Sequence, residues 1–460
     1  MTESVRPSQK KAVWGGPPFH DRHPVDLLLT LLLVVGFFLG PLKLFGVSWI
    51  SYAGPDCLAL LILLVVFAER VANQRPLFAA SPLSVPLLLL AGFCVLELAN
   101  PDSPFIRSVM GLRSWILYLS FYFVGLYTLR SVKQLERLYT LLGVLGLLSA
   151  AYGLYQWQVG PQSFTNWSDY YGRYARRMWS VQSGVAVFRA FSTFVTPNAF
   201  GGNMALLMLL ALGVAASPRI HARWRVVAAA AFVVLGAGIA ASGSRGPVVQ
   251  LLLGATVGLA FIPGVRARAR VGFIGLGVTA VAAVVVFFLI GPVIGERLVT
   301  IFDPQAFFWK WFYPLTIGIR TAQEHPFGVG MGYTSGVPRF IANPLFQELP
   351  TMNIDSGYGS AASELGFIGL VLFTYFALKV GVEGFRTWKR LPAGRLRDLL
   401  LGPALIAATY PIVSVILQPQ AALPSSIYSW LLIGMLMKAP RLQRGPDADQ
   451  LLHSSVYPGQ

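Results

Sequence analysis

The sequence predicts an all-α, polytopic integral membrane protein with about 12 transmembrane helices, each long enough to cross the hydrocarbon core. Of the 460 residues, 55% are hydrophobic and only 12% are charged, and the mean hydropathy is +0.62. One soluble core does not bury so much apolar surface, so lipid must cover most of it. Because unpaired backbone groups are not tolerated in lipid, each long apolar run is expected to be a helix.

Apolar runs of spanning length recur along almost the whole chain, with short polar or Gly/Pro-rich turns between them. The expected spans are 26–45, 54–69, 83–99, 114–129, 138–157, 198–216, 226–242, 247–264, 271–294, 358–379, 399–416 and 427–438. This gives a transmembrane domain over 26–438, a cytoplasmic segment over 1–25 and a cytoplasmic, disordered tail over 439–460. No small-residue cleavage site follows the first run, which is expected to remain as an anchor.

The formal net charge of +17 does not indicate nucleic-acid binding, because the basic residues recur between spans and are not pooled in one domain. If the N-terminus is cytoplasmic, the basic clusters fall on the cytoplasmic side, as the positive-inside rule requires. They include Arg70, Arg75, Arg130, Lys133, Arg137, Arg219, Arg223, Arg225, Arg266, Arg268, Arg270 and the run from Arg386 to Arg397. The even span count then places the C-terminus inside as well.

Two expected outward loops, 158–197 and 296–357, are much longer than the others, and loops of such length are usually functional. They break the positive-inside rule, since they contain Arg173, Arg176, Arg177, Arg189, Lys310, Arg320 and Arg339. An anionic ligand is therefore expected on this face. The aromatic run 307–313, followed by Arg320, suits a helix lying in the outer interface, or equally an aromatic belt with a snorkelling charge.

A single arginine, Arg245, stands at the tight junction 242–247 between two expected spans. Pro247 suits the first turn of the second helix. Backbone amides at a helix start together with a guanidinium group form a natural phosphate site. The alternative is an arginine that only snorkels to lipid headgroups.

Two carboxylates accompany the tenth expected span. Asp355 stands at its mouth, either as the N-cap of the helix or as a general base facing a cationic outer cavity. Glu364 lies inside the span and must be shielded from lipid, either as a hydrogen-bond partner between helices or as a second functional acid.

The segment from Arg189 to Gly369 resembles the Wzy/WaaL superfamily of O-antigen ligases and surface-polysaccharide polymerases, and more distantly the SEDS peptidoglycan polymerases. Three landmarks occur in the family's order: the segment 189–198 with Pro197 opening a helix, Ser244-Arg245-Gly246, and the glycine-rich element 325–332. The resemblance implies a GT-C-like architecture with the active site on the extracytoplasmic face of the bacterial cytoplasmic membrane.

In the ligases a histidine usually stands where this chain has Asp355, ahead of the motif that begins at Glu364. An aspartate in this place is similar to many polymerases and to the SEDS enzymes, in which the matching aspartate is considered catalytic. The resemblance therefore favours Asp355 as the base. A second family arginine has no clean counterpart; Lys310 and Arg320 are its nearest substitutes.

The expected function is a metal-independent, inverting polysaccharide polymerase without a cofactor. Its donor and acceptor would be undecaprenyl-pyrophosphate-linked glycans in the membrane, and a chain-length regulator would be a possible partner. Asp355 and Arg245 are the expected catalytic residues, and the expected substrate-binding residues are Arg189, Lys310, Arg320, Arg176, Arg177 and Tyr358. Outer aromatic residues would stack on sugars or anchor the interface. The alternatives are an O-antigen ligase and a lipid-linked glycan flippase.

Overall fold

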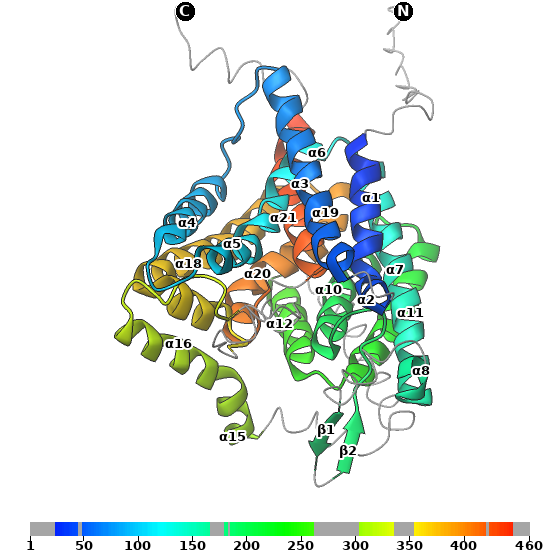
Figure 1. Cartoon of the computed structure of the whole chain (residues 1–460). Helices are drawn as coiled ribbons and strands as arrows, with labels where there is room; N and C mark the ends of the chain where they lie inside the picture. Colours follow the sequence, from blue (N-terminus) through cyan, green and yellow to red (C-terminus); the bar gives the residue numbers. More distant parts are fainter. Residues whose placement is uncertain are drawn as a thin grey trace, which may run out of the picture.

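The computed structural model describes residues 24–44, 48–165, 179–182, 185–261, 303–334, 354–419 and 423–444. This part of the chain is predominantly helical, as the sequence predicts, with one short β-hairpin. The ninth expected span, 271–294, lies outside the described residues, as do the segments 166–178 and 335–353 of the two long loops. Figure 1 shows the arrangement of the elements.

The helices before the hairpin match the first five expected spans. They are α1 (Pro24–Phe37), α2 (Leu39–Leu44), α3 (Ser48–Ala72), α4 (Ser84–Leu96), η1 (Glu97–Ala99), α5 (Phe105–Leu112), η2 (Arg113–Leu117), α6 (Phe121–Thr128), α7 (Val132–Val159) and α8 (Gln162–Thr165). The hairpin follows, with β1 (Trp179–Gln182) antiparallel to β2 (Val185–Phe188).

The second half of the chain contains the helices that carry the sequence landmarks. They are α10 (Pro197–Ala216), α11 (Ala222–Ser242), α12 (Arg245–Phe261), α15 (Pro304–Phe307), η5 (Phe308–Phe312), α16 (Tyr313–Glu324), α18 (Gly357–Arg390), α19 (Arg395–Leu399), α20 (Leu401–Ile416) and α21 (Ser425–Arg444). Pro197 occupies the first turn of α10, where its missing N–H is not needed.

Helix α10 lies at the centre of the bundle and packs against α7, α11, α12, α20 and α21. Most of its side chains are buried, so it is apolar on all sides and has no lipid-facing stripe. Close helix packing depends on glycine at several crossings. At Gly213 of α10, for example, a Cβ atom would stand 2.8 Å from the backbone nitrogen of Gly402.

Among the described residues, five helical stretches are long and apolar enough to cross a membrane. They are Phe105–Thr128, Val132–Val159, Pro197–Ala216, Ala222–Ser242 and Gly357–Arg390; Pro24–Phe37, Ser84–Ala99 and Leu401–Ile416 are apolar but shorter. The chain is therefore an integral membrane protein with several spans, while the expected number of 12 stays a prediction.

Several expected boundaries are wrong. The sequence predicts an all-α protein without strands, but a β-hairpin forms in the first long loop. The tenth span does not end at 379 but continues to Arg390, with a break at Gly366, whose φ of 65° no other residue adopts easily. The last helix continues through Pro440 to Arg444, so this part of the expected disordered tail is helical.

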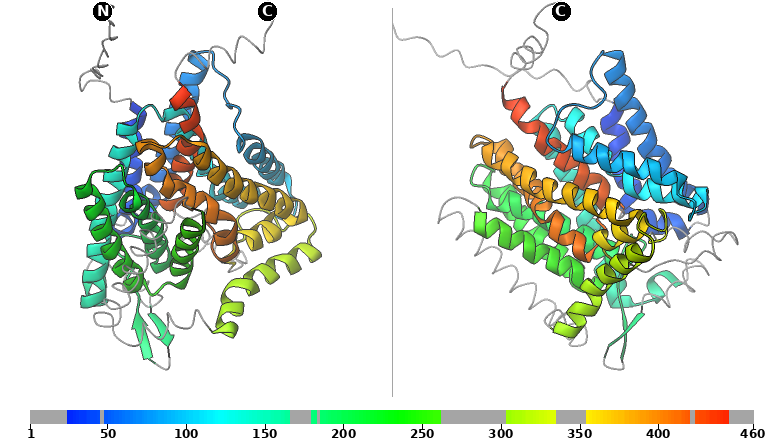
Figure 2. Two further views of the ribbon diagram at one scale, coloured as in Figure 1. Left: turned by 180° about the vertical axis from the view of Figure 1, so that it is seen from behind. Right: turned by 90° about the vertical axis from the view of Figure 1, so that its left-hand side faces the viewer.

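The bundle has two distinct ends. The start of α1 and the end of α21 lie at one end, whereas the hairpin and α15 project from the opposite end (Figures 1 and 2). We call the second the hairpin end. The other we call the basic end, because Arg219, Arg395 and Arg397 lie there, where α10 leads into α11 and α18 leads into α20.

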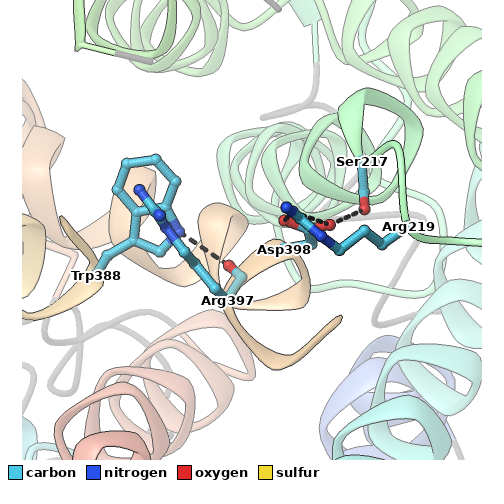
Figure 3. Close-up of polar contacts among 5 residues, drawn as sticks. All are labelled: Ser217, Arg219, Trp388, Arg397 and Asp398. Atoms are coloured by element: carbon cyan, nitrogen blue, oxygen red, sulfur yellow. Dashed lines mark hydrogen bonds and ion pairs between the residues drawn. The ribbon is translucent and has the colours of Figure 1, made fainter. Parts of the chain in front are cut away.

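Ion pairs join these loops at the basic end. The Asp398 carboxylate accepts hydrogen bonds from Ser217 Oγ at 2.6 Å and Arg219 Nη1 at 3.2 Å. The Trp388 indole donates to the Arg397 carbonyl oxygen at 2.9 Å, and the Arg397 guanidinium lies 4.8 Å from the centre of the same indole (Figure 3). The loop after α10 is thus fastened to the loop after α18.

Candidate functional site

A cavity with a volume of about 130 Å³ opens at the hairpin end, where the ends of several helices meet. The residues that line it are Arg189, Asn198, Gly243, Ser244, Arg245, Gly246, Pro247, Trp311, Asp355, Ile416 and Leu417. Arg189, Arg245 and Asp355 are far apart in the sequence, and the fold brings all three to one place.

Helix starts dominate the wall of the cavity. Asn198 belongs to the first turn of α10, the segment from Arg245 to Pro247 forms the first turn of α12, and Asp355 precedes the first turn of α18. Backbone N–H groups at helix starts are not paired within their own helix, and the helix dipole adds positive potential there. Together with two guanidinium groups, this wall favours an anion such as a phosphate.

Hydrogen bonds to three oxygens hold Arg189 in a defined orientation. Its Nε donates to the Ser242 carbonyl oxygen at 3.0 Å, and its Nη2 donates to Asn198 Oδ1 at 2.9 Å and to Ser244 Oγ at 2.8 Å. The Ser244 hydroxyl in turn lies 3.1 Å from Asn198 Oδ1. The first two sequence landmarks are therefore one structural unit, which fixes a guanidinium group at the cavity.

The chain that follows Arg189 is fastened inside the bundle by a residue that sequence reasoning missed. Gln156 of α7 is buried, and its Oε1 accepts hydrogen bonds from the backbone N–H groups of Phe191 and Ser192, both at 2.8 Å. The backbone N–H of Ala190 donates to the Ala241 carbonyl oxygen at 3.0 Å. A glutamine within an apolar span was the available signal in the sequence, but it did not reveal these partners.

Arg245 is the first residue of α12 and follows directly on Gly243 and Ser244. Gly243 ends α11 with a left-handed φ of 55°, which lets the chain reverse without a longer loop. Burial lowers the pKa of the Arg245 guanidinium, and the carboxylate of Asp303 raises it. An arginine so perturbed remains protonated at neutral pH, so the cavity keeps this positive charge.

Asp355 is not the N-cap of α18, contrary to one of the two sequence interpretations. The cap is Ser356, whose Oγ accepts a hydrogen bond from the Gly359 backbone N–H at 3.1 Å. The Asp355 carboxylate is therefore not needed for capping, and the residue lines the cavity. Neighbouring bonds fix its backbone: Gln418 Nε2 donates to the Ile354 carbonyl oxygen at 2.6 Å, and Gly357 N–H donates to the Leu417 carbonyl oxygen at 2.9 Å.

Trp311 is the aromatic residue in the wall of the cavity. It is 2% exposed, whereas its neighbours Phe308, Trp309, Phe312 and Tyr313 are each more than 40% exposed. The aromatic run therefore has two faces, with one indole turned inward and the other rings turned outward. The outward rings suit a membrane interface. The sequence showed the run but not which ring faces inward.

Glu364 serves as a hydrogen-bond acceptor between segments, the first of its two expected roles. Its Oε2 accepts from the Trp115 indole at 2.7 Å, and its Oε1 accepts from the Thr334 hydroxyl at 2.6 Å and from the Thr334 backbone N–H at 2.5 Å. The side chain is buried and does not line the cavity. These bonds satisfy the carboxylate within the bundle.

The glycine-rich element packs against the break in α18 and not into the cavity. The Val329 backbone N–H donates to the Ser363 carbonyl oxygen at 2.9 Å, and the Phe367 N–H donates to the Pro326 carbonyl oxygen at 3.0 Å. Gly328 needs its φ of 87°, and a Cβ atom there would stand 2.4 Å from the Glu364 carbonyl oxygen. The element therefore braces the outer part of α18.

The structure does not bring every predicted site residue to the cavity. Arg320 is exposed on α16, and Tyr358 packs edge-on against Phe373 at a ring distance of 5.3 Å; neither lines the cavity. Arg176 and Arg177, and the side chain of Lys310, lie outside what the structure describes. Within the described ranges, no three His, Cys, Asp or Glu side chains gather as metal ligands would.

Comparison with known protein families gives a match to part of the chain. Residues 230–374 match the Wzy_C family model, which is described as O-antigen ligase. The matched segment contains Arg245, Asp355 and Glu364 and ends within α18, while Arg189 precedes it. No curated protein matches the chain. The predicted resemblance to this superfamily is confirmed over the matched segment.

Proposed function

We propose that this chain, whose residues 230–374 match the Wzy_C family model, is a surface-polysaccharide polymerase of the bacterial cytoplasmic membrane. The enzyme would transfer a glycan from a polyprenyl-pyrophosphate donor to a lipid-linked repeat unit. The hairpin end would face the periplasm, and the basic end would face the cytoplasm, in agreement with the positive-inside rule. A chain-length regulator is the expected protein partner.

One observation supports this proposal above the others: two guanidinium groups and a carboxylate from three distant segments line a single cavity. A periplasmic glycosyltransferase has no nucleotide-sugar pool, so its donor must carry its own activated leaving group. A lipid pyrophosphate is such a group, and Arg189 and Arg245 are the cations suited to bind it. Asp355 supplies the base in the same cavity.

The proposed reaction is a single displacement. The acceptor hydroxyl oxygen attacks the anomeric carbon of the donor sugar, and its proton passes to the Asp355 carboxylate. The bond between the anomeric carbon and the pyrophosphate oxygen breaks, and its electron pair leaves with the polyprenyl pyrophosphate. A glycosidic bond forms with inversion at the anomeric carbon, and Arg245 and Arg189 stabilise the charge that grows on the leaving group.

An O-antigen ligase is the second candidate, since the matching family model carries that description. A ligase would use the same donor chemistry but pass the polymer to a different acceptor, such as lipid A-core. Asp355 stands where the resemblance leads one to expect histidine in ligases, and this favours the polymerase. A flippase for lipid-linked glycans is less favoured, because the cations converge in a cavity at the hairpin end.

The test is reconstitution of the purified protein in liposomes with lipid-linked repeat units, followed by gel analysis of chain length. The wild type should produce a ladder, and Asp355→Asn should reduce its rate by about 10² to 10⁴, the usual contribution of a general base. Asp102→Asn is the matched control. Asp102 is an exposed acid that pairs with His325 at 3.5 Å and lies outside the cavity, so this variant should keep the ladder.

Each other outcome has a clear meaning. A ladder of unchanged rate from Asp355→Asn would refute the base assignment. Product on lipid A-core without any ladder would replace the polymerase by the ligase. Movement of labelled lipid-linked repeat units across the bilayer, without any new glycosidic bond, would support the flippase.

A further inference from the structure

A second, larger cavity lies between α7 and α11 near the basic end. Its volume is about 340 Å³, and its walls are formed by α7 and α11, with Leu207, Leu210 and Ala211 of α10 as part of its floor. It is distinct from the cavity that contains Asp355, with which it shares no lining residue.

The cavity exists because two neighbouring helices separate. Helices α7 and α11 are close at Gly146, where a Cβ atom would stand 3.3 Å from Leu235. At Gly143, about one turn nearer to the basic end, a Cβ atom would meet no other atom within 4 Å. The helices therefore enclose an apolar crevice that widens towards the basic end.

The crevice has the length of one leaflet of a bilayer. Its lining on α7 runs from Glu136 to Leu147, a rise of about 16 Å along a helix. Half of a hydrocarbon core is about 15 Å thick. Between its two ends the crevice is lined mainly by Leu, Val, Ala and Gly residues. A hydrocarbon chain that follows the bilayer normal would therefore fit it.

The mouth of the crevice is polar, aromatic and cationic. Arg395 and Glu136 line it and form an ion pair at 2.7 Å, and Trp224, which is 48% exposed, lies on the α11 side. The exposed residues Arg137 and Arg223 adjoin two of these lining residues in sequence. With Arg219 and Asp398 included, the cations in this region outnumber the carboxylates. This distribution suits a negatively charged headgroup next to an apolar chain.

We propose that this crevice is a binding site for an anionic phospholipid of the leaflet at the basic end. One acyl chain would occupy the space beside Gly143, and the phosphate would lie near Arg395 and the Trp224 indole. The polyprenyl substrate is a less suitable occupant, because its pyrophosphate would be bound by the arginines at the opposite end of the bundle. Helix α11, with its 21 residues, separates the two ends by about 30 Å.

Native mass spectrometry of the purified full chain in detergent tests this proposal. The probes are dioleoyl phosphatidylglycerol, dioleoyl phosphatidylcholine and polyprenyl phosphate. The wild type should bind phosphatidylglycerol more tightly than phosphatidylcholine. Gly143→Leu should weaken phosphatidylglycerol binding about tenfold or more, because the new side chain displaces at least two buried methylenes of the lipid.

A matched control separates this effect from a general change in the helix. Gly92 of α4 is also a helical glycine whose Cβ atom would meet nothing within 4 Å, and it lies outside the crevice. Gly92→Leu should leave lipid binding unchanged. Since neither substitution meets protein atoms at the Cβ position, both proteins should fold.

A second pair of variants tests the headgroup. Arg395→Gln should reduce the preference for phosphatidylglycerol about fivefold, the usual contribution of one basic residue near a lipid surface. Arg386→Gln is its control, because Arg386 is likewise exposed and ion-paired but does not line the crevice. Equal binding by wild type and Gly143→Leu would overturn the proposal. Loss of polyprenyl phosphate binding alone in Gly143→Leu would overturn it in favour of the substrate chain.

Discussion

The two ends of the bundle use arginine in different ways. At the basic end, Arg219 pairs with Asp398 and Arg395 pairs with Glu136, and these pairs join one loop or helix to another. At the hairpin end, Arg189 is bound by a network of hydrogen bonds, in which it donates to a carbonyl, an amide and a hydroxyl oxygen from two helix junctions. These hydrogen bonds orient the guanidinium group at the cavity.

The arginines at the basic end thus have a structural role, whereas those at the hairpin end are suited to bind the substrate. An arginine that joins two loops needs only an approximate geometry, and an exposed pair of this kind contributes little to stability. An arginine that binds a leaving group must be preorganised, because its contribution depends on position in the transition state. We expect substitutions at the hairpin end to affect activity strongly and those at the basic end to affect it little.

Among the arginines of the two ends, the largest effect is expected for Arg245. Arg245→Ala should lower the polymerisation rate by about 10² to 10³, as is typical when one preorganised charge stabiliser is removed. Arg219→Ala, the matched change at the basic end, should leave the rate within about twofold, because the half-exposed Arg219 forms an ion pair with Asp398 far from the cavity. Initial rates in liposomes, normalised to inserted protein, measure both. Equal losses from the two variants would remove the distinction between the ends.

A smaller effect is expected along α7, which reaches both ends. Gln156→Leu should destabilise the protein by about 1–3 kcal/mol for each amide that loses its acceptor, and it should also lower activity by displacing Arg189. Tyr139→Phe removes a single bond to the Leu399 carbonyl oxygen and should cost stability only. Thermal unfolding in detergent measures the loss of stability in each variant, and the rate assay measures the loss of activity. Full activity in Gln156→Leu would show that the segment after Arg189 needs no such support.

For Asn198 we expect a still smaller effect, which should concern activity alone. Asn198→Ala removes one acceptor of the Arg189 guanidinium, and the loss of a hydrogen bond to a charged group corresponds to about a tenfold decrease in rate. Arg189→Lys keeps the positive charge but loses the planar set of guanidinium donors, and it should lower the rate to a similar extent. The assay is the same ladder formation, with the melting temperature as a control for folding. A rate equal to wild type in both variants would argue against orientation of Arg189 as the role of this network.

The smallest effect is expected for Asp398→Asn at the basic end. The change weakens the contact with Arg219, which is 47% exposed, so the free energy of unfolding should fall by only about 0–1 kcal/mol. Chain length and rate should not change. A loss of activity without a loss of stability would reveal that the basic end communicates with the cavity.

The sequence predicted the parts of the fold that depend on local patterns. Apolar runs of spanning length became helices, Pro197 opens α10, and the junction around Arg245 is as short as its residues suggested. The number of spans does not follow from the sequence in the same way, because α1 and α20 are apolar but shorter than a spanning helix. Apolar length alone does not show how a helix is placed in the bilayer.

The candidate site was predictable only in part. The sequence named Arg189, Arg245 and Asp355, but their convergence depends on contacts between distant segments. Of the two interpretations of Asp355, the N-cap is wrong. Asp and Ser are both good capping residues, they stand side by side, and Ser356 provides the cap. The orientation of Trp311 and the hydrogen-bond partners of Gln156 depend on tertiary packing, which the sequence pattern alone does not show.

The break at Gly366 divides α18 into two helical segments. The glycine-rich element is hydrogen-bonded to α18 on both sides of Gly366, at Ser363 and at Phe367, and it continues from α16, which also packs against α18. The position of Asp355 therefore depends on segments outside its own helix. Grafting α18 alone onto a related scaffold would therefore misplace the acid. Transplanting α16, the glycine-rich element and α18 together should preserve the position of Asp355.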